Sequence, residues 1–162
     1  MPALVPKSIA LNDLEQIGFT TETCLMCRLV KDNNLVIFDD EHTVVFLSAY
    51  PRFWGHAIVS LKRHVHYFSD LNEEEYRSLF ENARKVAIAI ENTLKPLRTY
   101  IASIGATENK INTCPHIHVN VIPIYDKDIK PSQVFTWENG VYTGTEIEWE
   151  QLKTNFQNAM NA

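Results

Sequence analysis

The sequence contains few of the residues that mark non-globular proteins. It has five glycines and seven prolines in 162 residues, and it shows no internal repeat, low-complexity tract or Gly/Ser linker. These absences exclude a collagen-like or fibrous protein, and 45% hydrophobic with 22% charged residues is an ordinary globular composition. We expect a single domain over residues 1–162, with residues 1–22 and 126–162 as extensions of its main body.

Long apolar runs and an excess of basic residues are also absent. No apolar run reaches the ~18 residues that a membrane-spanning helix needs, and the N-terminal residues lack the features of a secretory signal. The net charge is -5, whereas non-specific nucleic-acid and membrane binders usually have a basic surface. The sequence therefore predicts a cytoplasmic protein with no membrane partner and no nucleic-acid partner.

Cysteine is scarce as well, and its number is odd. Three cysteines fit poorly with a disulfide framework, and in a reducing compartment a closely spaced pair is more typical of a metal or redox site. Cys24 and Cys27 form such a pair. A redox pair of the thioredoxin type would need a βαβ pattern around it, which the sequence does not show. Two unremarkable thiols are the other alternative to a metal site.

The apolar pattern predicts a mixed α+β fold with an antiparallel sheet. Residues 69–94 predict a long helix, because three glutamates lie in its first turn and its apolar residues recur every three or four positions. A short helix at 11–17 and a last helix at 145–158 flank this region, and the chain between 123 and 145 has no clear pattern. Five strands are predicted, at 35–38, 43–47, 56–61, 99–104 and 116–122.

Polar and apolar residues alternate in the segment His116-Ile117-His118-Val119-Asn120-Val121-Ile122-Pro123. Alternate residues of a strand share a face, so the two histidines and the asparagine should point to one side and the apolar residues to the core. A row of polar groups on a half-buried strand is costly unless they bond a ligand, a metal or one another. An exposed strand face with solvated histidines is the alternative.

This segment resembles the motif of the histidine triad (HIT) family, His-φ-His-φ-His-φ-φ with φ apolar, except that Asn120 occupies the third histidine position. The context is similar too: the hairpin FDDEHTVVFLS, the segment GHAIVSLKRH, a long helix, a strand, a loop and then the triad. The resemblance covers roughly residues 24–125. It implies a HIT-like fold, in which an antiparallel sheet of about five strands carries a long helix, followed by a C-terminal helix.

Proteins of this family attack the α-phosphorus of a nucleoside phosphate with the middle histidine, forming a nucleotidyl-histidine that water or another acceptor resolves. The resemblance thus implies a hydrolase that cleaves a phosphoanhydride or phosphoramidate, such as a dinucleoside polyphosphate. A neutral imidazole is a suitable nucleophile near pH 7. The implied catalytic residues are His118, Asn120 and Thr113. The implied substrate-binding residues are Phe46, Ser48, Ser103, Thr113, His118 and Asn120.

The asparagine at the third triad position leaves the reaction open. An amide can donate a hydrogen bond but cannot transfer a proton at pH 7. A nucleotide- and zinc-binding module with little turnover is therefore one alternative. A nucleotidyltransferase or phosphorylase is another, because the uridylyltransferase branch of the family has glutamine at this position. His56 falls at a family position near the phosphate, although a single histidine at the start of a strand is more often structural.

The cysteine pair acquires a metal interpretation from the same resemblance. Two cysteines and two histidines are a complete tetrahedral ligand set for zinc. Several HIT proteins hold zinc with such a pair, a histidine just before the long helix and the first histidine of the motif. The resemblance implies structural zinc bound by Cys24, Cys27, His64 and His116, with His66 as the alternative to His64. It also implies a homodimer, because many small HIT proteins share the sheet and the long helix between two chains.

Overall fold

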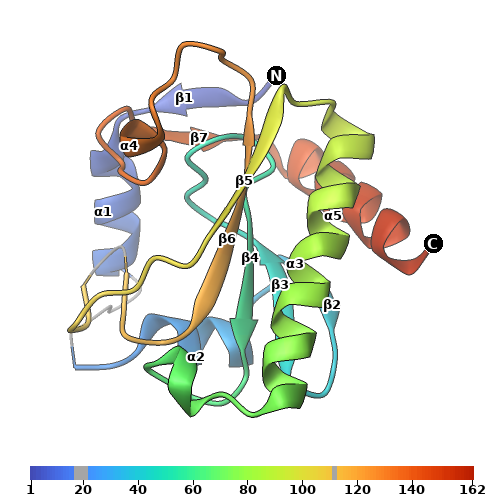
Figure 1. Ribbon diagram of the computed structural model, residues 1–162. Coiled ribbons are helices and arrows are strands. Elements are labelled where there is room, and N and C mark those ends of the chain that lie inside the picture. Colours follow the sequence, from blue (N-terminus) through green and yellow to red (C-terminus); the bar gives the residue numbers. More distant parts are fainter. Residues whose placement is uncertain (17–21, 111–112) are drawn as a thin grey trace.

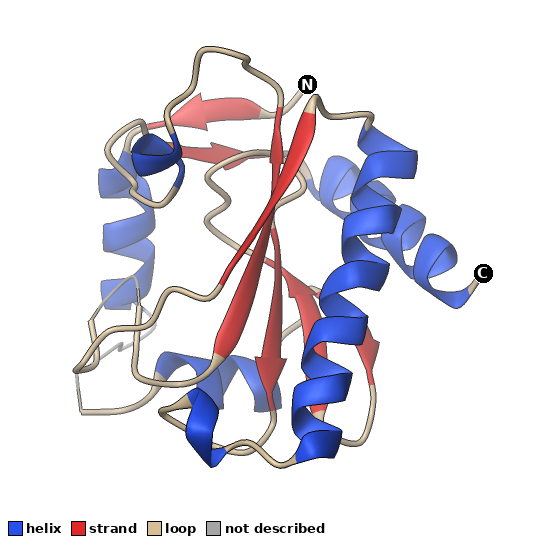
Figure 2. Cartoon of the chain, viewed as in Figure 1, coloured by secondary structure: helices blue, strands red, loops and turns tan. Residues whose placement is uncertain are grey.

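A five-stranded antiparallel sheet with helices on both faces forms the centre of the molecule, seen in a computed structural model that describes residues 1–16, 22–110 and 113–162 (Figure 1 and Figure 2). The strand order is β2-β3-β4-β6-β5. The expected α+β fold with about five strands is thus confirmed. The strand bounds are Val36–Asp39 for β2, Thr43–Leu47 for β3, Ala57–Leu61 for β4, Arg98–Ala102 for β5 and His118–Ile124 for β6.

The predicted hairpin joins β2 and β3 through a turn that is fixed by Asp40. One carboxylate oxygen accepts a hydrogen bond from the backbone N–H of Thr43 at 2.8 Å, an arrangement that favours a tight turn. The other oxygen accepts from Ser78 at 2.9 Å and from Asn82 at 2.6 Å, both on the long helix α3, Glu73–Leu94. One charged side chain therefore shapes the turn and ties the hairpin to the helix.

The long helix begins four residues later than the sequence predicts, at a capping box. The Asn72 side chain accepts from the backbone N–H of Glu75 at 2.8 Å, and the Glu75 carboxylate accepts from the backbone N–H of Asn72 at 3.1 Å. The helix ends at Leu94, and its C-cap Lys95 adopts a left-handed conformation just before Pro96. No helix among the described residues is long and apolar enough to cross a membrane.

The main core lies between one face of the sheet and two helices, α3 and the C-terminal helix α5, Glu146–Asn161. Val119 and Val121 of β6 pack there with Leu79 of α3 and Phe156 of α5. The alternation that the sequence predicts for this strand is therefore confirmed, and its polar residues are left on the opposite face. The predicted last helix, 145–158, corresponds to α5.

The triad strand is shifted by two residues from its predicted bounds of 116–122. His116 lies in a bend before β6, and the strand continues through Pro123 to Ile124. Proline is accommodated because β4 pairs with β6 only as far as Val121, so the missing N–H of Pro123 interrupts no bond to β4. The shift places the first histidine of the motif outside the sheet.

Several short elements were not predicted. The helix expected at 11–17 falls within α1 up to residue 16, and residue 17 lies outside the described residues. The chain between 123 and 145, which the sequence leaves without a pattern, contains a helical turn and a strand that pairs with residues 3–5 (Figure 1). The unpredicted elements are β1 Ala3–Val5, α2 Leu25–Lys31, η1 Phe68–Asp70, α4 Pro131–Val134 and β7 Val141–Thr143, whereas α1, Lys7–Gln16, contains the predicted helix and begins four residues before it.

Candidate functional site

Four residues from three distant parts of the chain meet at one point. Cys24 caps the N-terminus of α2 and Cys27 lies in its first turn, while His64 follows β4 and His116 precedes β6. One ligand atom from each lies within 4.8 Å of the others. The structure therefore brings together all four residues that the sequence predicts as zinc ligands.

The spacing of these atoms suits a tetrahedral metal ion. The Sγ of Cys27 lies 3.2 Å from Nδ1 of His64 and 3.4 Å from Nδ1 of His116, and the two Nδ1 atoms are 3.2 Å apart. The Sγ of Cys24 lies 3.4 Å from Nδ1 of His116. Zinc bonds to sulfur and nitrogen of the usual lengths would hold neighbouring ligand atoms roughly 3.5 Å apart. The donor set and its geometry both fit zinc.

The buried imidazole of His116 is held in the tautomer that a metal requires. Its Nε2 lies 2.8 Å from the carbonyl oxygen of Leu61. A carbonyl can only accept, so Nε2 carries the hydrogen and the lone pair of Nδ1 points to the cluster. A hydrogen bond of this kind orients metal-ligating histidines in proteins.

Two further side chains flank the cluster without joining it. The Nε2 of His66 lies 2.8 Å from Nε2 of His64, on the side of that ring away from the cluster. The buried Cys114 thiol lies 3.6 Å from the Sγ of Cys24 and acts as a hydrogen-bond donor that lowers the pKa of Cys24 to about 3. Of the two histidine alternatives, the geometry thus selects His64, and Cys114 supports the thiolate form of one cysteine.

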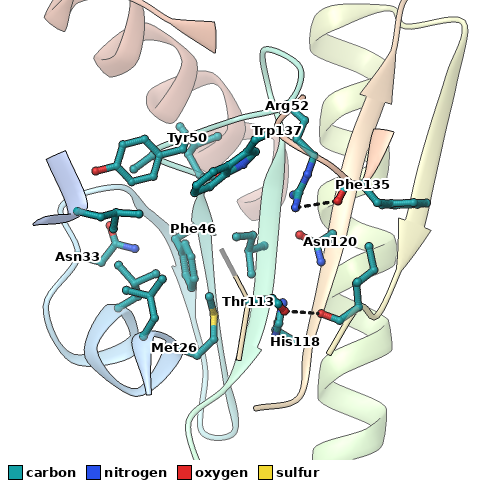
Figure 3. A pocket seen from close by; sticks show the side chains of 18 residues that line it. Met26, Asn33, Phe46, Tyr50, Arg52, Thr113, His118, Asn120, Phe135 and Trp137 are labelled. Carbon is teal, nitrogen blue, oxygen red and sulfur yellow. Dashed lines mark hydrogen bonds between the residues drawn. The ribbon is translucent and has the colours of Figure 1, made fainter. Parts of the chain in front are cut away.

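A pocket of about 190 Å³ opens on the sheet face that carries His118 and Asn120 (Figure 3). Met26 and Phe46 line its apolar side, and Thr113 lies near His118. The pocket thus has an apolar wall and a polar wall that face each other, as a ligand with an aromatic part and an anionic part requires.

His118 offers one ring nitrogen to this pocket. Its Nδ1 lies 2.6 Å from the carbonyl oxygen of His116, so Nδ1 carries the hydrogen and Nε2 keeps its lone pair. The side chain is only 5% exposed, and this burial, with the nearby charge of Arg52, lowers the pKa of His118. The imidazole is therefore neutral at pH 7, which is the nucleophilic form.

Asn120 is positioned by a histidine behind it. The Nε2 of His56 lies 3.0 Å from Oδ1 of Asn120, and His56 is fully buried and outside the pocket wall. Burial, together with the charge of Arg52, lowers the pKa of His56 to about 3, so this ring is neutral and donates through Nε2. The Asn120 amide consequently keeps its NH₂ group for the carbonyl of Ala102, at 3.5 Å, and for a ligand.

The remaining predicted substrate residues fall into two groups. Phe46, Ser48 and Thr113 line the pocket, and the Thr113 hydroxyl donates to the carbonyl of Ile104 at 3.1 Å. Ser103, in contrast, is exposed just beyond β5 and does not line the pocket. The structure therefore gives no support to a substrate contact from Ser103.

Sequence reasoning missed the residues that close the other end of the pocket. They are Tyr50 and Arg52 from the loop after β3, and Phe135 and Trp137 from the segment after α4. The rings of Tyr50 and Trp137 meet edge to face, 5.9 Å apart. The sequence signal for these residues was the presence of large aromatic side chains, such as Phe135 and Trp137, in a segment that has no apolar periodicity. Large aromatic side chains are usually packed against other residues or against a ligand.

Comparison with known proteins agrees with this geometry. The family model of the HIT domain matches residues 30–127, more than half of the chain. An uncharacterized HIT-like protein of Mycoplasma genitalium is 30% identical over 110 residues, which are 66% of this chain and 77% of the relative. The asymmetrical bis(5'-nucleosyl)-tetraphosphatase of Schizosaccharomyces pombe is 31% identical over 90 residues, 54% of this chain and 48% of the relative.

Solved structures show the same fold. A hypothetical histidine triad nucleotide-binding protein of Sulfolobus tokodaii has a TM-score of 0.66 at 20% identity, over 85% of this chain and 92% of its own. A zinc-bound histidine triad family protein of Mycobacterium smegmatis has a TM-score of 0.64 at 20% identity, over 88% and 96%. With the family model matching more than half of its length, the chain belongs to the histidine triad (HIT) family.

Proposed function

We propose that this protein is a nucleotide-binding hydrolase that cleaves a phosphoanhydride or phosphoramidate at the α-phosphate of a nucleoside phosphate, through a nucleotidyl-histidine intermediate. The observation that carries this proposal is the His118 ring, neutral, fixed at Nδ1 by a backbone carbonyl and open to the pocket at Nε2. The HIT family contains nucleotide-binding proteins and hydrolases, in keeping with the names of the relatives.

In the proposed reaction, Nε2 of His118 attacks the α-phosphorus and the bond from that phosphorus to the leaving group breaks. The hydrogen on Nδ1 stays bonded to the His116 carbonyl, which stabilises the positive charge that the ring gains. Water then attacks the same phosphorus and frees the histidine. Asn120 and Thr113 are the proposed hydrogen-bond partners of the phosphoryl oxygens.

The nucleoside would occupy the apolar side of the pocket. Phe46 offers a ring face for the base, and the Ser48 hydroxyl is the proposed partner of the ribose. Turnover of adenosine polyphosphates and phosphoramidates, with water, phosphate or a sugar phosphate as acceptor, tests the proposal. Release of a nucleoside monophosphate in water supports it, activity only with a phosphate acceptor indicates a transferase or phosphorylase, and binding without turnover indicates a binding module.

We also propose that the Cys24, Cys27, His64 and His116 group holds zinc in a structural role. Four protein ligands complete a tetrahedral site and leave no position for a reactive water. The metal would fasten α2 to the residues just before β6. Because the carbonyl of His116 orients the His118 ring, the same ligand would also hold the proposed nucleophile in place.

A homodimer is the proposed assembly. The strand β5 is an edge of the sheet, and Ile101 on it is 47% exposed. Exposed aromatic residues, Tyr76 and Phe80, lie on α3, which packs beside β5. An apolar edge strand next to an apolar helix face is a surface that a second copy of the chain could cover.

A further inference from the structure

Arg52 is a cation of the pocket wall that does not belong to the triad motif. It lies in the loop between β3 and β4, and its guanidinium extends into the pocket next to Asn120 (Figure 3). The loop is anchored beside it, because the backbone N–H of Tyr142 in β7 donates to the carbonyl of Pro51 at 2.9 Å. The backbone that carries Arg52 is therefore held in place by the fold.

No carboxylate among the described residues pairs with the guanidinium of Arg52. Its Nη2 donates to the carbonyl of Phe135 at a long 3.5 Å, and its Nε is buried without a hydrogen-bond partner. In the parts of the chain that the structure describes, Arg52 takes part in no salt bridge. Burial lowers the pKa of Arg52 to about 10, so it stays charged at pH 7. A partly buried charge without a counter-ion is unfavourable, and an anionic ligand would supply the missing charge.

The polar residues follow one another along a single wall. Figure 3 shows His118 at one end of this wall, Asn120 beyond it and Arg52 at the other end, while Phe46 lies across the pocket. If the base packs on the apolar side and His118 reaches the α-phosphate, the group attached to that phosphate extends past Asn120 toward Arg52. The cation thus faces the leaving group.

Resting on the proposed function, we propose that Arg52 binds an anionic phosphate leaving group, so that this pocket selects nucleoside polyphosphates over phosphoramidates. When Nε2 of His118 bonds to the α-phosphorus, the bond from that phosphorus to the bridging oxygen breaks and its electron pair stays on the oxygen. A phosphate leaving group is stable near pH 7 with this negative charge, so it does not have to be protonated as it departs. A cation beside it stabilises the charge.

The asparagine of the triad fits the same chemistry. The amine that leaves a phosphoramidate must take up a proton, which neither the Asn120 amide nor the Arg52 guanidinium can give at pH 7. A phosphate leaving group removes that requirement. An asparagine at the third triad position and an arginine that has no carboxylate partner among the described residues therefore favour the same substrates, those with a phosphate leaving group.

Two substrates with the same nucleoside test this assignment: diadenosine triphosphate, whose leaving group is ADP, and adenosine 5'-phosphoramidate, whose leaving group is ammonia. Arg52→Gln should lower kcat/KM for diadenosine triphosphate by ~10²-fold and change kcat/KM for the phosphoramidate by less than about threefold. Only the transition state of triphosphate cleavage develops negative charge beside Arg52. Arg52→Lys should recover part of the loss, since it keeps the charge without the guanidinium fork.

A matched control is Arg77→Gln, which removes the same charge from the exposed surface of α3, across the sheet from the pocket. Arg77→Gln should leave kcat/KM unchanged for both substrates. An equal loss on both substrates in Arg52→Gln, or no loss on the triphosphate, would overturn the leaving-group assignment. An Arg52→Gln protein that melts well below the wild type would show that Arg52 supports the fold instead.

Ligand binding separates this inference from the proposed function. The non-hydrolysable analogue α,β-methylene-ADP should raise the melting temperature of the wild type more than AMP does, and Arg52→Gln should abolish the difference. If the wild type cleaves neither substrate but shows this difference, the proposed hydrolysis fails and the anion site stands. Equal stabilisation of the wild type by AMP and α,β-methylene-ADP overturns the anion site, whatever the activity.

Discussion

The two polar residues on β6 have different neighbours, and these neighbours give them different chemistry. His118 donates to a backbone carbonyl, which leaves a basic nitrogen free for a phosphorus atom. Asn120 accepts from the buried, neutral His56, which leaves an NH₂ group that can only donate a hydrogen bond. The geometry therefore separates a nucleophile from a group that holds phosphate without moving a proton.

Asn120→His should raise phosphoramidate hydrolysis and leave polyphosphate hydrolysis nearly unchanged. A titratable ring can protonate a departing amine, and positioned acid catalysis is worth ~10²–10⁴-fold. Initial rates on adenosine 5'-phosphoramidate and diadenosine triphosphate give the comparison, with Asn120→Gln as the control that keeps an amide. Equal gains on both substrates would mean that proton delivery limits both reactions and that the polyphosphate preference has another origin.

For single residues, the sequence predicts a position in the site where that position follows from the alternation of polar and apolar residues along one strand. The alternation along β6 places His118 and Asn120 on one face because strand periodicity is local. Arg52 and Trp137 could not be predicted, since their place in the pocket depends on how the loop after β3 and the segment after α4 pack together. Ser103 shows the converse: its position in the motif is right, but the chain beyond β5 leaves it on the surface.

Among the elements, α2 depends most on the proposed metal. It has seven residues, too few for a helix that is stable by itself, and its N-cap and first turn supply two of the proposed ligands. Its Met26 also forms part of the apolar pocket wall. Zinc binding would thus stabilise both the helix and the pocket.

Cys27→Ser should abolish zinc binding and lower the melting temperature, because structural zinc contributes directly to the folding free energy. Metal analysis of protein purified without chelator should find about one equivalent per wild-type chain. Cys114→Ser is the matched control: this thiol is buried near Cys24 but outside the group, and its replacement should keep the metal. A natively folded wild type without stoichiometric metal would contradict the site.

The elements also differ in how far the sequence predicts them. α3 has 22 residues, so its apolar period and its capping signals are both visible in the sequence. In contrast, β1 and β7 have three residues each and α4 has four, which is shorter than any periodicity can show. These short elements form because they pair or pack with distant parts of the chain.

For the whole molecule, the surface that the proposed dimer would cover is the exposed edge strand β5. We expect the wild type to show a dimer mass in light scattering, and Ile101→Lys to show a monomer, because a charge on an edge strand opposes pairing with a second strand. Ile147→Lys is the control, since Ile147 is 78% exposed on α5, which packs against α3 and against β2 at the opposite edge of the sheet. A wild-type protein that is monomeric at micromolar concentration would contradict the dimer.

The overall architecture follows from the sequence because the strands, the long helix and the motif are each locally encoded and occur in the order of the HIT family. The depth and selectivity of the pocket do not follow in the same way. Leu14, Phe135 and Trp137 lie outside residues 30–127, the part that the family model matches, and yet they line the pocket. The extensions therefore complete a site whose reactive residues belong to the family.

The turnover of a folded His118→Ala protein tests the central claim most directly. Because His118 is the one imidazole among the described residues that line the pocket, hydrolysis of diadenosine triphosphate should fall by at least ~10⁴-fold. Zinc content and thermal stabilisation by AMP should stay close to the wild type, which shows that the site is intact. Substantial hydrolysis by this folded variant would contradict the nucleophile assignment and the covalent mechanism that depends on it.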